Sequence, residues 1–266
     1  MAKNIEPTLK LISVFLKLGK NENFVIPEYQ RSYSWNITQC DKLWQDIEDF
    51  ISSEASDPYF FGTIIVDCSD IDKFSLIDGQ QRTTTFLLLL KALLLRLNDA
   101  FKNIPNDDED SERLKAGLKA NRDRIMVILY KAEDEDIPSM LKDNTKTQNI
   151  LVLENKSINE LHLEEVNKII GAIDFETAEQ NAYKIPRRQK DNKYTNHFRN
   201  FKYFYDNLGE KSDSQLNKFA KVFLERCQVI EIRSWQVEQA ITMFNSLNSS
   251  GLPPRRRRYY ISSTIF

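Results

Sequence analysis

Residues 77–85 combine the side-chain types from which proteins build phosphate sites. They read Ile-Asp-Gly-Gln-Gln-Arg-Thr-Thr-Thr and join an expected strand to an expected helix. At such a junction, free backbone N–H groups and the positive end of the helix dipole bind anions. Arg82 can fork onto phosphate oxygens, Asp78 can hold a divalent cation, and Gly79 permits a close backbone approach. The segment therefore predicts a phosphate and metal site.

The amide and hydroxyl side chains of the same segment suit hydrolysis of a bound phosphate. Gln80 or Gln81 can orient a water through its amide, as glutamine does in some nucleotide hydrolases, and Thr83 adds a hydroxyl at the helix start. The alternative is that the Asp-Gly pair is only a turn and that Thr83 or Thr84 only caps the helix. Residue types alone leave both interpretations open.

A second polar cluster follows an expected strand at residues 26–35. Here Tyr29, Gln30 and Arg31 stand among further aromatic residues. Aromatic and arginine side chains can stack a nucleotide base and hold its phosphates. The alternative is a structural loop whose tyrosines and tryptophan complete the core while Arg31 pairs with an acid.

A third cluster and a basic stretch lie in the second half of the chain. Residues 244–252 are expected to form a helix end, with Asn245 and Asn248 on nearly the same side of the helix. These two asparagines could complete a polar pocket, or they could simply cap the helix end. Residues 184–193 contain Arg187, Arg188 and Lys190, which can neutralise DNA phosphates or simply form an exposed polar loop.

Composition limits the functions that these clusters can serve. The chain has 266 residues, 41% apolar content and a net charge of −2, so it can bury a sizeable core but offers DNA only a local patch. Three cysteines without metal-ligand spacing fit a reducing cytosol and argue against zinc, which predicts a cytoplasmic protein. The start of the chain lacks a secretory signal, and no apolar run reaches the roughly 20 residues of a membrane span. With two histidines, a histidine-dependent nuclease centre is not expected.

Hydrophobic periodicity indicates the elements that position the clusters. Residues 59–66 and 73–77 predict a hairpin, and the apolar run at 83–97 predicts a helix buried at the centre of the fold. The other expected helices are 9–18, one capped by Thr38 and running to Phe50, 157–170, 194–208, 216–223 and 237–247, and the other expected strands are 24–27, 125–130 and 229–232.

The three clusters together make the chain resemble the N-terminal domain of the GmrSD-type restriction endonucleases, a ParB-like family. The family's Ile-Pro-x-Tyr-Gln-Arg, Asp-Gly-Gln-Gln-Arg and Phe-x-x-Leu-Asn-x-x-Gly motifs correspond to residues 26–31, 78–82 and 244–251. The chain departs from the family pattern where four arginines follow at 255–258. The resemblance implies an α+β fold, with a ParB/sulfiredoxin-like core, a small mixed sheet and extensive additional helices. We expect the core at 1–100 and a mostly helical part at 101–266 that closes the pocket, as one continuous unit.

The resemblance also implies a nucleotide-hydrolysing sensor of modified DNA. Asp78 would bind Mg²⁺, Gln80 and Gln81 would place the water, and Arg82 would steady the phosphates of GTP, ATP or CTP. The partners implied are modified DNA and a nuclease domain or subunit of the HNH type, with no membrane; assembly into a homo-oligomer is left open. Two alternatives remain, namely a ParB-like DNA-binding module without turnover and a metal-dependent nickase.

Overall fold

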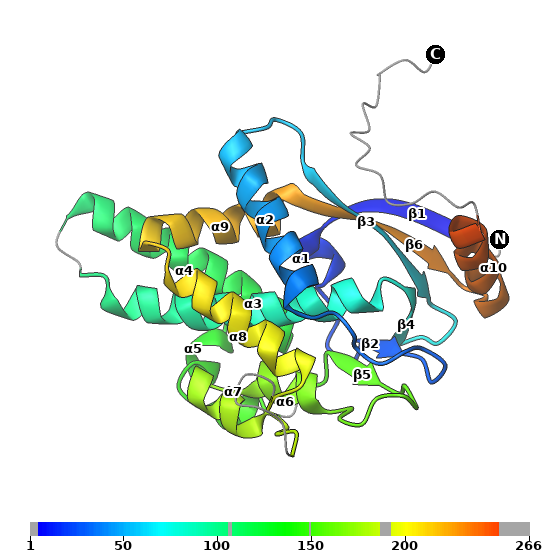
Figure 1. The fold of residues 1–266 in the computed structure, drawn as a ribbon. Helices are drawn as coiled ribbons and strands as arrows, with labels where there is room; N and C mark the ends of the chain where they lie inside the picture. Colours follow the sequence, from blue (N-terminus) through cyan, green and yellow to red (C-terminus); the bar gives the residue numbers. More distant parts are fainter. Residues whose placement is uncertain (1–4, 106–107, 149, 187–192, 250–266) are drawn as a thin grey trace, which may run out of the picture.

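The computed structural model describes residues 5–105, 108–148, 150–186 and 193–249, which form one mixed six-stranded sheet with helices on both faces (Figure 1). The strand order is β1-β6-β3-β4-β2-β5. The strands are β1 (Ile5–Leu11), β2 (Asn23–Ile26), β3 (Tyr59–Asp67), β4 (Lys73–Asp78), β5 (Leu153–Asn155) and β6 (Cys227–Ser234). The pairs β1·β6 and β3·β4 are antiparallel, whereas β3·β6, β2·β4 and β2·β5 are parallel. The predicted α+β class is confirmed, whereas the relation of the core to ParB stays a prediction.

Helices make up most of the remaining chain. They are α1 (Ile12–Phe15), α2 (Ile37–Ser53), α3 (Gln80–Asn103), α4 (Glu109–Tyr130), α5 (Ile137–Met140), α6 (Glu165–Gly171), α7 (Phe175–Asn181), α8 (Asn196–Gly209), α9 (Asp213–Arg226) and α10 (Val237–Ser249), with a short 3-10 turn at Asn144–Lys146. Helix α3 lies at the centre and contacts α4, α6, α8 and α9. Because it is surrounded, nearly all its side chains as far as Leu97 are buried, as its sequence predicted.

The two faces of the sheet carry separate apolar clusters. Ile64 and Val66 of β3 point into the main core with the helices, whereas Ile65 between them belongs to a small cluster with Ile77 and Ile232. This alternation follows from the two-residue period of a strand. Helix α10 covers the small cluster and is the helix on the right of Figure 1, away from the helical layers.

The expected helix at 9–18 is confirmed only for residues 12–15. Residues up to Leu11 form strand β1, which pairs with β6 from Ile5 opposite Ser234 to Leu11 opposite Gln228, and only α1 is helical. The apolar spacing fits either element, and pairing with a distant strand decides between them. Asn36, rather than Thr38, caps α2, because its side chain accepts a hydrogen bond from the Thr38 backbone N–H at 2.8 Å.

Two other expected elements are also corrected. Residues 125–130 are not a strand but the last turns of α4, where a buried face of Ile125, Met126 and Leu129 has helical spacing. The expected helix at 157–170 is reduced to α6, because the preceding segment runs alongside the end of β2. Its backbone donates from Lys156 N to Ile26 O at 2.9 Å and from Ile158 N to Glu28 O at 3.2 Å. These tertiary hydrogen bonds compete with helix formation.

The remaining expected elements are confirmed in type, and strands from both halves of the chain share the sheet. Strands β5 and β6 follow residue 100, yet β6 lies between β1 and β3. The expected core at 1–100 therefore completes its sheet with later residues. Within the described ranges, no helix is both long enough and apolar enough to cross a membrane.

Candidate functional site

The first two sequence motifs meet where β4 ends and α3 begins, and Phe244 of the third lies behind the same strand end. The side chain of Gln30 donates through Nε2 to the carbonyl oxygen of Ile77 at 2.9 Å, and Gln80 Nε2 donates to Gln30 Oε1 at 2.9 Å. From the other face of the sheet, Phe244 on α10 packs against the cluster that includes Ile77. Segments more than 160 residues apart in the sequence thus lie around the end of one strand. Their proximity could not be read from the sequence alone.

Gly79 shapes the turn between β4 and α3. Its φ of 86° lies in the left-handed region, and a Cβ at this position would stand 2.8 Å from Ile64 Cγ1. The first backbone hydrogen bond of α3 runs from Thr83 N to Gly79 O at 2.9 Å, and the Thr83 hydroxyl donates to the same carbonyl. The backbone N–H groups of residues 80–82 have no acceptor among the described residues. The turn therefore offers three free donors at the positive end of a 24-residue helix.

Asp78 ends β4 beside these donors, and its side chain is 41% exposed. Its nearest cation is Arg82, with 4.0 Å between Asp78 Oδ2 and Arg82 Nη2. Within the described part of the chain, no group of three or more His, Cys, Asp or Glu side chains could hold a metal ion. A cation at Asp78 would therefore need most of its ligands from water or from a bound substrate.

Arg82 turns toward strand β3 rather than toward solvent. Its guanidinium donates to the carbonyl oxygen of Phe61 at 2.6 Å and to that of Thr63 at 2.8 Å. Burial lowers the pKa of Arg82, and the nearby Asp78 carboxylate opposes that shift. The residue between the two acceptors is Gly62, whose φ is 100°. Sequence reasoning missed Gly62, although a glycine inside an aromatic strand is a recognised sign of close approach.

The two glutamines of the motif are buried and brace the loop that carries the first motif. Gln81 Oε1 accepts from the backbone N–H groups of Ser34 at 2.8 Å and Trp35 at 3.1 Å, and its Nε2 donates to Ser32 O at 3.2 Å. Gln80 Nε2 also donates to Arg31 O at 3.2 Å. Among the described residues, no donor reaches Gln80 Oε1, so this amide keeps a free acceptor.

The loop that carries the first motif, residues 27–35, is called the first-motif loop below. It presents some side chains to solvent and buries others. Tyr29 is 59% exposed and Arg31 is exposed. The pKa of Tyr29 is raised by burial and by the charge of Asp67. Tyr33 is buried instead, and its hydroxyl shares hydrogen bonds with Thr85 at 2.7 Å and Asn200 at 2.9 Å. The alternative of a core-completing loop thus holds for Tyr33 and not for Tyr29.

Residues from the second half of the chain fix this loop from outside. Ser157 Oγ donates to Gln30 O at 2.5 Å, Glu160 accepts from Tyr33 N at 2.9 Å, and Asn200 Nδ2 donates to Trp35 O at 2.8 Å. Sequence reasoning missed all three positions. Each is a polar residue in a segment without a motif, so no local pattern marks it.

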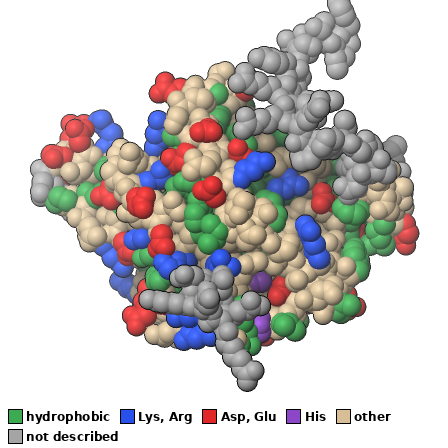
Figure 2. All heavy atoms as spheres, viewed as in Figure 1, with side chains coloured by type: hydrophobic (Ala, Val, Ile, Leu, Met, Phe, Trp, Pro, Cys, Tyr) green, Lys and Arg blue, Asp and Glu red, His purple; other side chains and the backbone are tan. Residues whose placement is uncertain are grey.

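Several predicted positions are not brought into this site by the described structure. Asn245 is exposed on α10, while the side chain of Asn248 and all of Gly251 lie outside the described residues. The basic candidates Arg187, Arg188 and Lys190 and the four arginines at 255–258 also lie outside them. On the face shown in Figure 2, basic and acidic side chains are interspersed over the helical part, which agrees with the balanced net charge.

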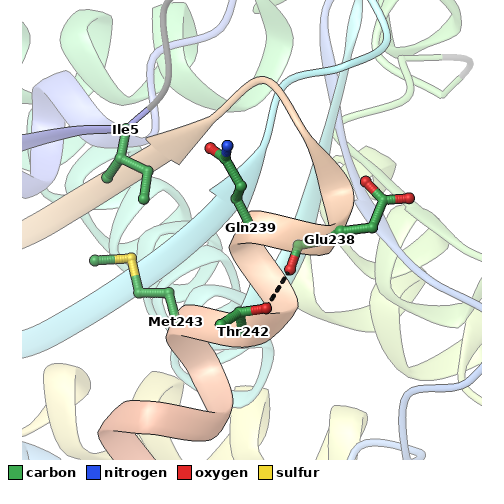
Figure 3. A pocket seen from close by; sticks show the side chains of 5 residues that line it. All are labelled: Ile5, Glu238, Gln239, Thr242 and Met243. Carbon is green, nitrogen blue, oxygen red and sulfur yellow. Dashed lines mark hydrogen bonds between the residues drawn. The ribbon is translucent and has the colours of Figure 1, made fainter.

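Two cavities are described, and both lie away from the meeting point of the motifs. One, of about 320 Å³, is an open groove between β1 and α10, where Ile5 faces Gln239 and Met243 (Figure 3). The other, of about 40 Å³, lies beside Lys91 among α3, α4 and α5. The candidate site is formed by the start of α3 and the loop that carries the first motif.

A family model described as the N-terminal domain of the GmrSD restriction endonuclease matches residues 12–256. The match spans most of the chain and includes all three motifs that meet around the end of β4. No curated protein matches the chain. The extent of the family match shows that this chain belongs to the GmrSD restriction endonuclease N-terminal domain family.

Proposed function

We propose that this chain binds and hydrolyses a nucleoside triphosphate within a DNA restriction system that acts on modified DNA, and so licenses cleavage by a nuclease domain or subunit. The observation that carries the proposal is that Gln30 of the first motif meets Gln80 of the second at the free N-terminus of α3, while Phe244 of the third packs behind the end of β4. Family membership supports a role in restriction and an interaction with DNA. Nucleotide turnover is the step that needs a direct test.

The phosphate groups would bind at the backbone N–H groups of residues 80–82. These donors are free in the described structure and lie at the positive end of a long helix, and the left-handed Gly79 lets the chain enter that helix directly from β4. Arg31 adds an exposed positive charge from the neighbouring loop, and its guanidinium makes no described ion pair or hydrogen bond. Tyr29 presents an exposed ring on which a base can stack.

Asp78 fits a magnesium ion that arrives already bound to its nucleotide. Mg²⁺ commonly keeps several waters and takes one or two carboxylates plus phosphate oxygens. Asp78 supplies one half-exposed carboxylate at the helix start, which fits that pattern, whereas a fully protein-built site would need more ligands. The ion would supply charge neutralisation at the phosphates, and Asp78 would hold it there.

Of the two glutamines, Gln80 is the better candidate for placing the attacking water. Its Oε1 is free to accept a hydrogen bond from water, while its Nε2 is fixed by Gln30 and Arg31. The amide of Gln81 is engaged through both atoms with residues 32–35. Gln81 would therefore support the loop, and any direct part in hydrolysis would require those contacts to open.

Hydrolysis assays on wild type and Asp78→Ala test this proposal. Radiolabelled GTP, ATP and CTP are supplied separately with Mg²⁺, and phosphate release is measured for each protein. We expect Asp78→Ala to lose at least tenfold in rate, as removal of a positioned charge contact costs about that much. Asp70→Ala, an exposed carboxylate at the opposite end of the β3–β4 hairpin, is the matched control. Equal turnover by wild type and Asp78→Ala would remove the site assignment.

A second candidate is a module that binds nucleotide and DNA without turnover. It is favoured by the inward direction of the Gln81 and Arg82 side chains, which leaves few free groups for transition-state stabilisation. Equilibrium binding of a fluorescent nucleotide without phosphate release, together with nucleotide-dependent DNA binding, would support this function. Binding accompanied by steady phosphate release would exclude it.

A further inference from the structure

Arg82 is the one residue of the Asp-Gly-Gln-Gln-Arg motif whose side chain reaches another strand. Its guanidinium bridges the carbonyl oxygens of Phe61 and Thr63 at 2.6 and 2.8 Å, two charge-assisted hydrogen bonds. The same guanidinium lies 4.0 Å from Asp78 Oδ2. Arg82 thus connects the first turn of α3, strand β3 and the carboxylate that ends β4.

Gly62 makes this connection sterically possible. A Cβ at position 62 would stand 2.5 Å from Arg82 Nη1. The φ of 100° is also a backbone conformation that residues with side chains rarely adopt. Gly62 lies where the register between β3 and β6 shifts, between Phe60 and Thr63, and the carbonyls on both sides of it accept from the guanidinium. The irregularity of β3 at Gly62 and the Arg82 side chain are therefore sterically matched.

Arg31 is placed differently. It is exposed on the first-motif loop, and within the described ranges its guanidinium has no ion pair or hydrogen bond. Its own carbonyl accepts from Gln80, which keeps the residue beside the start of α3. A phosphate bound by Arg82 would require that side chain to leave two partly buried acceptors, whereas Arg31 can bind without breaking any described contact.

We propose that Gly62 and Arg82 form a positioning pair that fixes Asp78 and the start of α3, and that Arg31 is the arginine that meets the nucleotide phosphates. This assignment rests on the proposed nucleotide site. Arg82 acts through the residues that it holds, and Gly62 acts by leaving room for it.

A double-mutant cycle on thermal stability tests the pair without any nucleotide. Gly62→Ala and Arg82→Ala should each lower Tm, by roughly 5 °C or more, because each removes the two hydrogen bonds to carbonyls. The double variant should fall clearly short of the summed losses, since an alanine at 62 no longer meets the guanidinium. Additive losses would overturn the pairing. Arg113→Ala, an exposed arginine on α4, serves as control.

Nucleotide binding and turnover test the division of roles. Arg31→Ala should raise the Kd for Mg-GTP, Mg-ATP or Mg-CTP, whichever wild type binds, by about tenfold with unchanged Tm. Arg82→Lys keeps the charge but cannot span both carbonyls, so kcat should fall with little change in KM. An unchanged Kd in Arg31→Ala, or a rise in Kd only in Arg82→Lys, would overturn the assignment. If wild type binds no nucleotide, the proposed function and the role of Arg31 both fail, whereas the stability cycle still decides the pair.

Discussion

At the residue scale, Lys91 is an ionisable side chain buried among the helices. Its ammonium is fully buried on α3 and donates to the hydroxyl of Tyr130 at 2.7 Å and to the carbonyl of Ala172, just past the end of α6. Burial lowers the pKa of Lys91 from 10.5 to about 7, while the charge of Asp174 opposes the shift. The side chain joins three helices, but at a desolvation cost that depends on pH.

That cost predicts a pH dependence of stability. Below pH 7 the folded and unfolded chains both hold the Lys91 proton, so the full cost of the buried charge applies. Between pH 7 and 10.5 the folded chain releases the proton while the unfolded chain keeps it, so this residue's contribution to stability rises with pH. We expect urea unfolding at pH 7 and 9 to show a larger gain for wild type than for Lys91→Met. Parallel changes in the two proteins would contradict this account.

Gly79 gives a second prediction at this scale. Gly79→Ala should destabilise the protein by about 2–4 kcal/mol, because it combines a left-handed backbone with overlap against Ile64. Chemical denaturation measures the change. Gly19→Ala is the control, since a Cβ there would meet only the flexible end of Glu22. A loss at Gly79 no larger than at Gly19 would show that the turn can relax.

The motif residues show what sequence could and could not predict about the site. The place of residues 78–82 between a strand and a helix was predictable, because strand and helix patterns flank them. The directions of Gln81 and Arg82 were not, because their partners are backbone groups of the first-motif loop and of β3. Such partners have no sequence signature, since every residue offers the same backbone groups.

At the element scale, the contact between α3 and the first-motif loop should control local opening. Gln81→Ala removes the acceptor for the backbone N–H groups of Ser34 and Trp35. Hydrogen exchange of a peptide covering residues 32–36 should then speed up by roughly tenfold, the change expected from about 1.4 kcal/mol of lost protection. Gln180→Ala, on the exposed side of α7, should leave that peptide unchanged. Unaltered exchange in Gln81→Ala would mean that other contacts hold the loop.

Elements were predictable where their apolar pattern has a single interpretation. The face of α8 with Phe198, Phe201 and Leu208 is buried as its helical spacing indicates, and the hairpin β3–β4 forms as expected. Strand β1 was missed because its residues pair with β6, more than 200 positions away. A pattern read locally cannot include a partner at that distance, so propensity is overridden by tertiary pairing.

At the scale of the whole molecule, α10 covers one face of the sheet almost alone among the described helices. Its Phe244 and Met243 pack on Ile65 and Ile77, next to the candidate site. A chain ending at residue 236 should expose this cluster, bind more of the dye ANS and lose affinity for nucleotide. The control is Ile241→Ser, which changes a partly exposed side chain of the same helix. Unchanged dye binding in the shortened chain would show that the cluster is covered in another way.

The position of β6 governs the order in which the molecule can be built. The strand that joins β1 to β3 is supplied by residues 227–234, immediately before the helix that carries the third motif. During synthesis β1 therefore lacks its hydrogen-bonding neighbour until residues 227–234 have left the ribosome. Such high contact order makes folding slow, because β1 and β6 must meet across more than 200 residues. A chain synthesised only as far as α9 thus lacks both β6 and the third motif, so the sheet behind the candidate site is still incomplete at that point.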